Sequence, residues 1–148
     1  MRPDRIIVGE VRDAAAIDML NAMNTGHDGS MSTGHANSPR DMLSRLETLV
    51  LLGVDIPLLA VRKQIASAID IIIHLGRLRD RTRRVMEIVE VLDCVNNEIQ
   101  LQPLYYFNEK GQTKEGMVIG NLVRTDCELY NQEKLERAGI TYDSISRI

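Results

Sequence analysis

Apolar and polar residues follow one pattern in the first half of the chain and another in the second half. The apolar run IIV predicts a short strand over Arg5 to Gly9. Because no polar residue alternates within this run, we expect burial on both faces of a mostly parallel sheet. A helix should follow, with Asp13 as a capping residue and an end near residues 24–26. Its apolar face repeats at helical spacing in Ala16, Met19, Leu20 and Met23.

The next stretch predicts a second strand and another helix. The strand is expected over Met31 to Ala36. A clear helix start follows, with Ser38 at the N-cap, Pro39 at the first helical position and Asp41 at the third. We expect this helix to end at Gly53.

A third helix opens at the tripeptide DIP, residues 55–57. A strand is then expected over Ile71 to Leu78. Alternating helices and strands up to this point are typical of a layered α/β domain. The positions predicted to face inward on the third helix are Leu58, Val61, Ile65 and Ile69.

Beyond Arg84 the pattern becomes that of paired strands. A turn at Asn96–Asn97 should join the first two of them. A short helix is expected over residues 131–138, with Gly139 just past its end. The three strands are expected over residues 85–92, 99–107 and 116–124.

The composition is that of one globular domain. At 148 residues the chain is long enough to bury a core. We predict a single domain over residues 1–148, with an α/β part at 1–84 and a β-rich part at 85–148. The net charge of −3 gives no general attraction to nucleic acid or anionic lipid.

Other features concern the cellular compartment. Cys94 and Cys127 are isolated, which argues against a zinc site or a disulfide and fits a reduced, cytosolic compartment. No apolar run reaches the length needed to span a bilayer. Because Met1 stands directly before a strand and no signal peptide opens the chain, we expect an expression fragment.

Glu10 follows the first predicted strand, at the end where open α/β sheets place ligands. Its carboxylate could hold a Mg²⁺-bound water beside the phosphates of a nucleotide. The alternative is an ordinary charged residue in a loop. Arg12 could pair with a phosphate, or with Glu10 or Asp13.

Two histidines, His27 and His35, lie in a loop rich in glycine, serine and threonine. A zinc site would need two further ligands, and only Asp28 stands nearby. A histidine at a strand end can instead hydrogen-bond a γ-phosphate. The other interpretation is that both are polar loop residues with no ligand. Small residues around them would let the backbone approach a ligand closely, namely Gly26, Gly29, Gly34 and Ala36.

Five arginines gather between the two halves: Arg77, Arg79, Arg81, Arg83 and Arg84. Extended backbone would place four of them on one side, as in a ribbon that binds nucleic acid or phosphate. We favour a solvated hairpin or a subunit contact, because no aromatic residue is interleaved with the arginines. His74 is interpreted as a structural residue, and Tyr105 and Tyr106 as sheet-packing residues.

Three stretches together resemble one family, the type II/type IV secretion (traffic) ATPases. RPDRIIVGEVRD resembles the family's Walker B segment, and TGHDGSMSTGHANSP resembles its histidine box. The stretch IPLLAVRKQIASAIDIIIHLGRLRDRTRRV resembles the tight-adherence (Flp-type) pilus branch, as does KEGMVIGNLVRT in the tail. The distinctive motifs cover roughly Arg2 to Val91.

The resemblance implies the C-terminal half of a RecA-like P-loop NTPase core. This is an α/β fold with a mostly parallel sheet flanked by helices and a β-rich tail, and the sheet would be incomplete without the P-loop half. The full-length protein would be a hexameric ATPase that uses ATP and Mg²⁺ to power pilus assembly or secretion. It would be cytoplasmic and peripheral at the inner membrane, with a platform protein as partner and no nucleic acid.

Site residues are carried over by motif. Glu10 would act at the Mg²⁺ and its water, with Arg12 in the same cluster. His27 and His35 would sense the γ-phosphate or help to close the site. From the same two motifs, Gly9 and Thr33 are assigned to cofactor binding.

The departures from the family pattern predict an inactive fragment. The chain contains neither GxxxxGKS nor GxxxxGKT, the loop that cradles phosphates. The family's acidic box and N-terminal domain are also missing, and the absence of four zinc-spaced cysteines separates the chain from the type II secretion branch. We therefore expect no bound ATP or Mg²⁺ and no hydrolysis by these 148 residues.

Two other functions remain open. The chain could be a stand-alone interaction module that docks a membrane platform or a partner subunit. It could also be a nucleic-acid-binding domain built on the arginines, although the acidic total charge argues against this. In addition, an apolar edge strand around residues 6–8 predicts a dimer or a strand swap.

Overall fold

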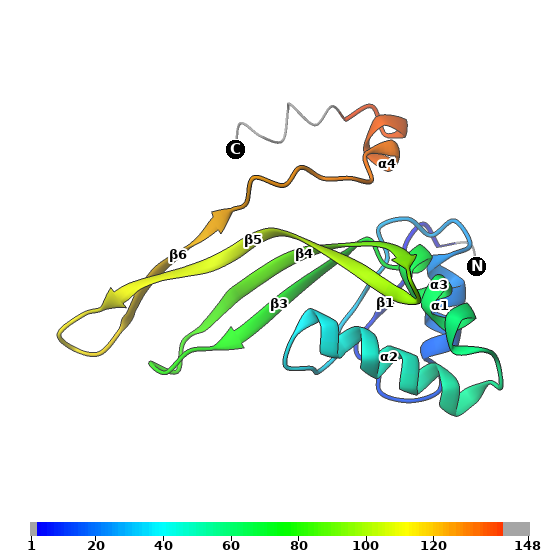
Figure 1. Cartoon of the computed structure of the whole chain (residues 1–148), viewed down its shortest axis with the longest axis horizontal. Helices are drawn as coiled ribbons and strands as arrows, with labels where there is room; N and C mark the ends of the chain where they lie inside the picture. The colour runs from blue at the N-terminus through cyan, green and yellow to red at the C-terminus, as the bar shows by residue number, and fades with distance from the viewer. Residues whose placement is uncertain (1–2, 141–148) are drawn as a thin grey trace.

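The computed structural model describes residues 3–140. Three helices gather at one end of a long antiparallel sheet, and a C-terminal segment runs back along the sheet to a short fourth helix (Figure 1). In chain order the elements are β1 (Ile7–Val8), α1 (Ala16–Met23), β2 (Met31–Ser32), α2 (Pro39–Gly53), α3 (Leu58–Ala68), β3 (Ile71–Arg77), β4 (Arg83–Val95), β5 (Glu98–Gln112), β6 (Val118–Arg124) and α4 (Glu133–Arg137).

The strands form a parallel pair and an antiparallel sheet. β1 and β2 are parallel, with Ile7 opposite Met31 and Val8 opposite Ser32. The other four strands are antiparallel in the order β3-β4-β5-β6. The expected α/β fold with a β-rich tail is confirmed. The antiparallel part already begins at β3, ahead of the change near Arg84 that the sequence pattern indicates.

The first strand is shorter and more exposed than expected. The prediction that it is buried on both faces is wrong, because Ile7 is 64% exposed. Among the described residues, β1 pairs only with β2, so one of its edges has no neighbour. β2 is likewise shorter than the predicted range of residues 31–36.

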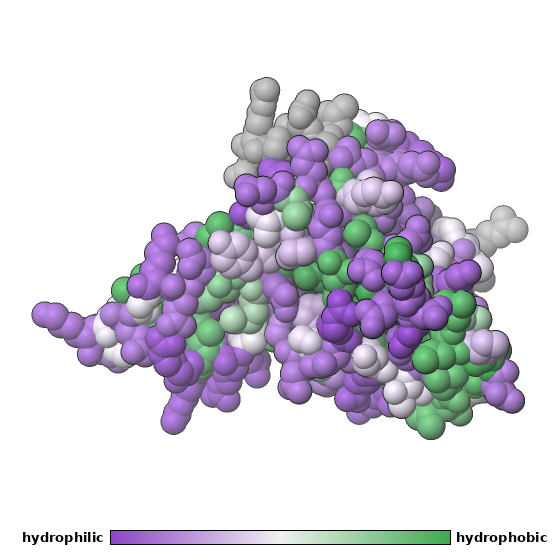
Figure 2. All heavy atoms as spheres, in the orientation of Figure 1, coloured by the Kyte–Doolittle hydropathy of each residue, from purple (hydrophilic) through white to green (hydrophobic). Residues whose placement is uncertain are grey.

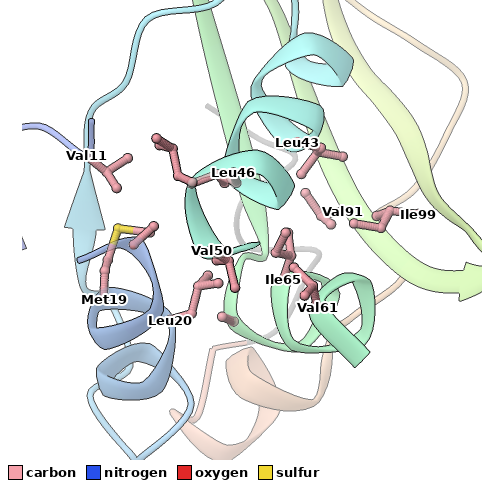
Figure 3. Packing of buried hydrophobic residues seen from close by; sticks show 13 residues of the cluster. Val11, Met19, Leu20, Leu43, Leu46, Val50, Val61, Ile65, Val91 and Ile99 are labelled. Atoms are coloured by element: carbon pink, nitrogen blue, oxygen red, sulfur yellow. The ribbon is translucent and has the colours of Figure 1, made fainter. Parts of the chain in front are cut away.

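The hydrophobic core lies between α1, α2, α3 and the helix-facing side of β4 (Figure 3). The predicted inner face of α1 is confirmed, with Leu20 completely buried. On α3, Val61 and Ile65 are also completely buried, but Leu58 is 40% exposed, so its predicted inward position is wrong. Figure 2 shows apolar surface at this end of the molecule, where the exposed leucines are Leu51, Leu52, Leu58 and Leu59.

Of the two predicted helix N-caps, the one at Ser38 is confirmed and the one at Asp13 is wrong. The predicted start of α2 is confirmed, because the Ser38 hydroxyl accepts a hydrogen bond from the Asp41 amide at 3.1 Å. Asp13 does not cap α1. Its carboxylate accepts a hydrogen bond from the amide of Ala15, one residue before the helix begins. Asp13 therefore shapes the turn that leads into α1.

The predicted turns of the β-rich part are confirmed. Asn96 and Asn97 connect β4 to β5 with φ values of 51° and 66°, a conformation that asparagine tolerates better than most residues. Gly139 follows α4 with φ 72°. Within the part of the chain that the structure describes, no helix is both long and apolar enough to cross a membrane.

Candidate functional site

Three of the predicted site residues lie together just beyond the β1–β2 pair. The Glu10 carboxylate lies 3.1 Å from the Arg12 guanidinium and 3.5 Å from Nε2 of His35. The Glu10 side chain is 25% exposed, whereas those of Arg12 and His35 are 68% and 82% exposed. A largely covered carboxylate thus lies between two exposed side chains that can reach a ligand.

Gly9 and Thr33 form the frame of this cluster. The Val11 amide donates to the Thr33 carbonyl at 2.9 Å, and the Thr33 hydroxyl donates to the Gly9 carbonyl. These bonds continue the pairing of β1 and β2 beyond their last ladder residues. They hold Glu10 beside the loop that carries His35. Gly9 contributes through its backbone carbonyl, and Thr33 contributes through both its carbonyl and its hydroxyl.

His27 lies apart from the other site residues. Its Nδ1 atom is 3.0 Å from the carbonyl of Ala22 in α1. Its own carbonyl accepts hydrogen bonds from the amide and the hydroxyl of Ser30, at 3.2 and 2.6 Å. The Ser30 hydroxyl in turn accepts a hydrogen bond from the Ile6 amide at 2.9 Å. His27 therefore organises the turn that leads into β2.

A groove of about 580 Å³ opens beside the cluster. One wall is formed by the loop before α2, including His35, and by the first turn of α2 as far as Met42. The other wall is β3 from Ile72 to Arg77, together with Arg83. His35 belongs to both the groove and the Glu10 cluster, whereas Glu10 and Arg12 do not line the groove. The groove therefore adjoins the cluster through His35.

The side chains at this site are compatible with a Mg²⁺ ion that Glu10 contacts through a water. No group of three metal-binding side chains occurs among residues 3–140. Mg²⁺ bound with a nucleotide keeps several waters and needs only one or two protein carboxylates. Glu10 can supply one such carboxylate through a water, and the phosphates would have to supply the remaining ligands.

The arginine cluster is a hairpin rather than a one-sided ribbon. Arg77 and Arg83 pair across β3 and β4, but Arg81 has a φ of 67°, which turns the chain. Arg79 makes a bidentate pair with Glu109, at 2.8 and 2.5 Å. This pairing lowers the pKa of Glu109. With one arginine already neutralised and another in the turn, the solvated-hairpin interpretation fits better than a nucleic-acid surface.

Sequence reasoning missed one buried charge, Glu90. Its side chain is completely buried in the middle of β4, although it stands in the apolar run VEV. The signal that could have identified Glu90 is its place between two apolar residues of a predicted strand. A buried acid there would need hydrogen-bonding partners from elsewhere in the chain. By contrast, His74 lies 3.4 Å from Glu87 across the sheet, which agrees with a structural role.

Residues 1–132 match the family described as "Type II/IV secretion system protein". The match covers both the Glu10 cluster and the antiparallel sheet. The chain belongs to this family. Its relatives include a putative conjugal transfer protein of Mycobacterium tuberculosis, which is 38% identical over 84% of this chain and 35% of its own length.

Two further similar proteins agree with the assignment. Conjugal transfer protein TrbB of Rhizobium radiobacter is 40% identical over 69% of this chain and 30% of its own length. A crystal structure of the VirB11 ATPase from the Brucella suis type IV secretion system, in complex with sulphate, is also similar. The two structures match with a TM-score of 0.57 and 30% sequence identity. The match covers 61% of this chain and 28% of the VirB11 chain. The chain spans about a third of the length of its curated relatives.

Proposed function

We propose that this chain is the C-terminal part of a hexameric motor ATPase that powers pilus assembly or protein secretion, in the tight-adherence branch of the family. The carrying observation is the cluster of Glu10, Arg12 and His35 at the end of a parallel strand pair. Membership of the secretion family and similarity to the VirB11 ATPase support the assignment. The motor would work at the cytoplasmic face of the inner membrane with a platform protein.

Each residue of the cluster has a distinct task in this proposal. Glu10 accepts hydrogen bonds from the water that will attack a phosphate, or from a water on the metal. Arg12 pairs with the Glu10 carboxylate and can turn toward a phosphate oxygen, since it is largely exposed. His35 stands where it can detect whether a phosphate is present. Mg²⁺ with ATP would supply charge neutralisation of the phosphates when bound.

The phosphate-binding half must come from outside these 148 residues, because no phosphate loop occurs in the sequence. The groove between the His35 loop and β3 is where such a half could approach the cluster. Phosphoryl transfer depends on positioning and charge stabilisation, and three side chains cannot supply both. The chain by itself should therefore neither bind nor hydrolyse ATP.

The first experiment reads the coding sequence upstream of Arg2 and expresses the protein with any phosphate loop found there. In that protein Glu10→Gln should lower ATP turnover on the order of a hundredfold with little change in nucleotide affinity. Glu136→Gln, an exposed control of the same chemistry on α4, should leave turnover unchanged. Unchanged turnover in Glu10→Gln would contradict the assigned role.

The second experiment titrates the 148-residue chain with ATP and Mg²⁺ in a calorimeter. We expect no saturable heat up to millimolar nucleotide. Micromolar binding would refute the inactivity of the chain and leave its membership of the family untouched.

A separate proposal concerns association of this chain with itself. Ile7 and Met31 are 64% and 61% exposed on the short parallel pair, and an apolar edge strand invites pairing. Dimers or strand-swapped dimers should appear in light scattering at high concentration, and Ile7→Lys should abolish them. A monodisperse monomer of the unaltered chain would rule out this form of association.

A further inference from the structure

The C-terminal segment from Asp126 to Arg137 lies across the sheet without adding to the core. None of its side chains is buried, and α4 buries no residue. Figure 1 shows the segment running from β6 back along the sheet to α4. Apolar burial therefore contributes little to its position, and polar contacts must hold it.

The strongest of these contacts is made by Glu90. Along β4, Val91 points into the helix-covered core, so the neighbouring Glu90 points to the opposite face. There its two carboxylate oxygens accept hydrogen bonds from the consecutive amides of Tyr130 and Asn131, at 2.8 and 2.7 Å. A completely buried carboxylate is stable only when such donors are present. Burial of the Glu90 carboxylate therefore requires the segment, and the position of the segment requires Glu90.

Gln102 on β5 extends the same contact. Its amide nitrogen lies 3.4 Å from the Glu90 carboxylate and donates to the Glu128 carbonyl at 2.5 Å. Both side chains of this sheet pair therefore bind backbone groups of the segment. Removing one member leaves buried polar groups unsatisfied, which costs more than the loss of an exposed hydrogen bond.

Lys134 extends the contact from the sheet to the histidine loop. Its ammonium lies 2.8 Å from Asp70, just before β3, and 3.3 Å from Asp28, beside His27. Partial burial lowers the pKa of Lys134, but hydrogen bonds and charge from the two aspartates outweigh this and raise it. The loop is joined to β1 by the Ser30 hydroxyl and the Ile6 amide. A path of contacts thus runs from Glu90 to the strand that presents Glu10.

We propose that residues 126–137 form a C-terminal clasp that the buried Glu90 fixes to the sheet. Lys134 of this clasp holds the His27–Asp28 loop, and through it the start of β1, in place. When the clasp is released, the loop loses its anchor on the sheet. The clasp is a positioning device and touches none of the reacting groups. It does not depend on the chain binding nucleotide.

Hydrogen exchange on the full 148-residue chain tests the clasp. In Glu90→Gln one acceptor becomes a donor facing an amide, so exchange at Tyr130 and Asn131 should rise by about tenfold or more. Exchange at Ser30 and Met31, whose amides bond to His27 and Ile6, should rise with it. Glu87→Gln, the same change on the same strand, should alter neither region.

A second variant separates the clasp from general destabilisation. Lys134→Met keeps the aliphatic stem and removes the charge, so exchange at Ser30 and Met31 should rise several-fold while the Glu90 contacts stay protected. Lys114→Met, in the exposed β5–β6 turn, serves as the control. If Glu90→Gln fails to fold by circular dichroism, Lys134→Met decides alone. Unchanged exchange at Ser30 and Met31 in the folded variants would overturn the proposal.

Discussion

The helix-covered end of the antiparallel sheet and its hairpin end share the same strands but are held by different forces. At the helix end, Val91 and Ile99 are 1% and 4% exposed and pack with α2 and α3. At the other end no residue from 76 to 88 is buried. There the strands extend beyond the helices. Val118 is buried at this end, and side-chain hydrogen bonds and ion pairs supply further contacts between the strands.

Asp80 and Arg79 illustrate the forces at the hairpin end. Asp80 in the β3–β4 turn accepts hydrogen bonds from the Thr82 amide and hydroxyl, at 2.9 and 2.7 Å, and from the Val118 amide at 2.8 Å. Arg79 crosses to Glu109 on β5. The Thr82 contacts fix the turn itself, whereas the Val118 and Glu109 contacts join one hairpin to the other. The comparison teaches that one sheet can combine a core that resists disruption with an extension that depends on pH and salt.

The largest effect is expected in the core. Ile65→Ala removes a completely buried side chain between α3 and β4 and should lower the free energy of unfolding by about 2–5 kcal/mol, because a cavity remains. Urea denaturation followed by circular dichroism measures it. Leu52→Ala, at a site 72% exposed, is the control and should change little. A loss below about 1 kcal/mol for Ile65→Ala would mean that the helix end is not a close-packed core.

The next effect concerns Asp80 and depends on pH. Its hydrogen bonds to Thr82 and to the Val118 amide lower its pKa from 3.8 to about 2. Because the folded-state pKa is the lower one, its stabilisation is complete above pH 3.8 and is lost as the pH falls toward 2.

Asp80→Asn should therefore lower the urea midpoint clearly near neutral pH. The gap between variant and unaltered chain should narrow as the pH falls through that range. A gap that stays constant with pH would show that the Asp80 charge has no part in holding the hairpins.

A smaller effect is expected at the start of α2. Ser38→Ala removes the cap on the Asp41 amide and should destabilise the chain by about 1 kcal/mol. Ser44→Ala, an exposed position within the same helix, should be neutral or slightly stabilising because alanine favours helices. Equal effects from the two variants would argue against a distinct contribution of the cap.

The smallest effect is expected for the Arg79–Glu109 pair, whose side chains are 50% and 37% exposed. A double-mutant cycle with Arg79→Ala and Glu109→Ala should give a small coupling that vanishes in molar salt. A larger, salt-insensitive coupling would make the hairpin end as firmly held as the core and would remove the contrast between them.

Prediction from the sequence succeeded for features of local structure, which residues close together in the chain determine. The Ser38 cap, the Asn96–Asn97 turn and the inner face of α1 all depend on residues within a few positions of one another. At the candidate site, Glu10, Arg12 and His35 lie in contact, and their functional roles stay predictions. His27 belongs to a different contact, because the loop turns it toward α1.

The errors concern burial, and they have one cause: whether a residue is buried depends on elements that are distant in the sequence. An apolar run predicts burial only if other elements cover it, and β1 has a single partner, so Ile7 is exposed. Leu58 matches the helical period of α3 but lies in the first turn, where the core does not extend. Glu90 reads as a solvent-facing position until a segment forty residues later covers it.

By itself, then, the sequence determined the helices, their apolar faces, the turns and the motifs of the secretion family, because each depends on local periodicity or on a contiguous pattern. Only the tertiary structure decided which strands pair, where the core ends along β4, and that Glu90 is buried beneath the clasp. It also decided that Glu10 meets His35 and that the clasp reaches Asp28. These outcomes require residues far apart in the chain to meet, and no local pattern encodes which of them will.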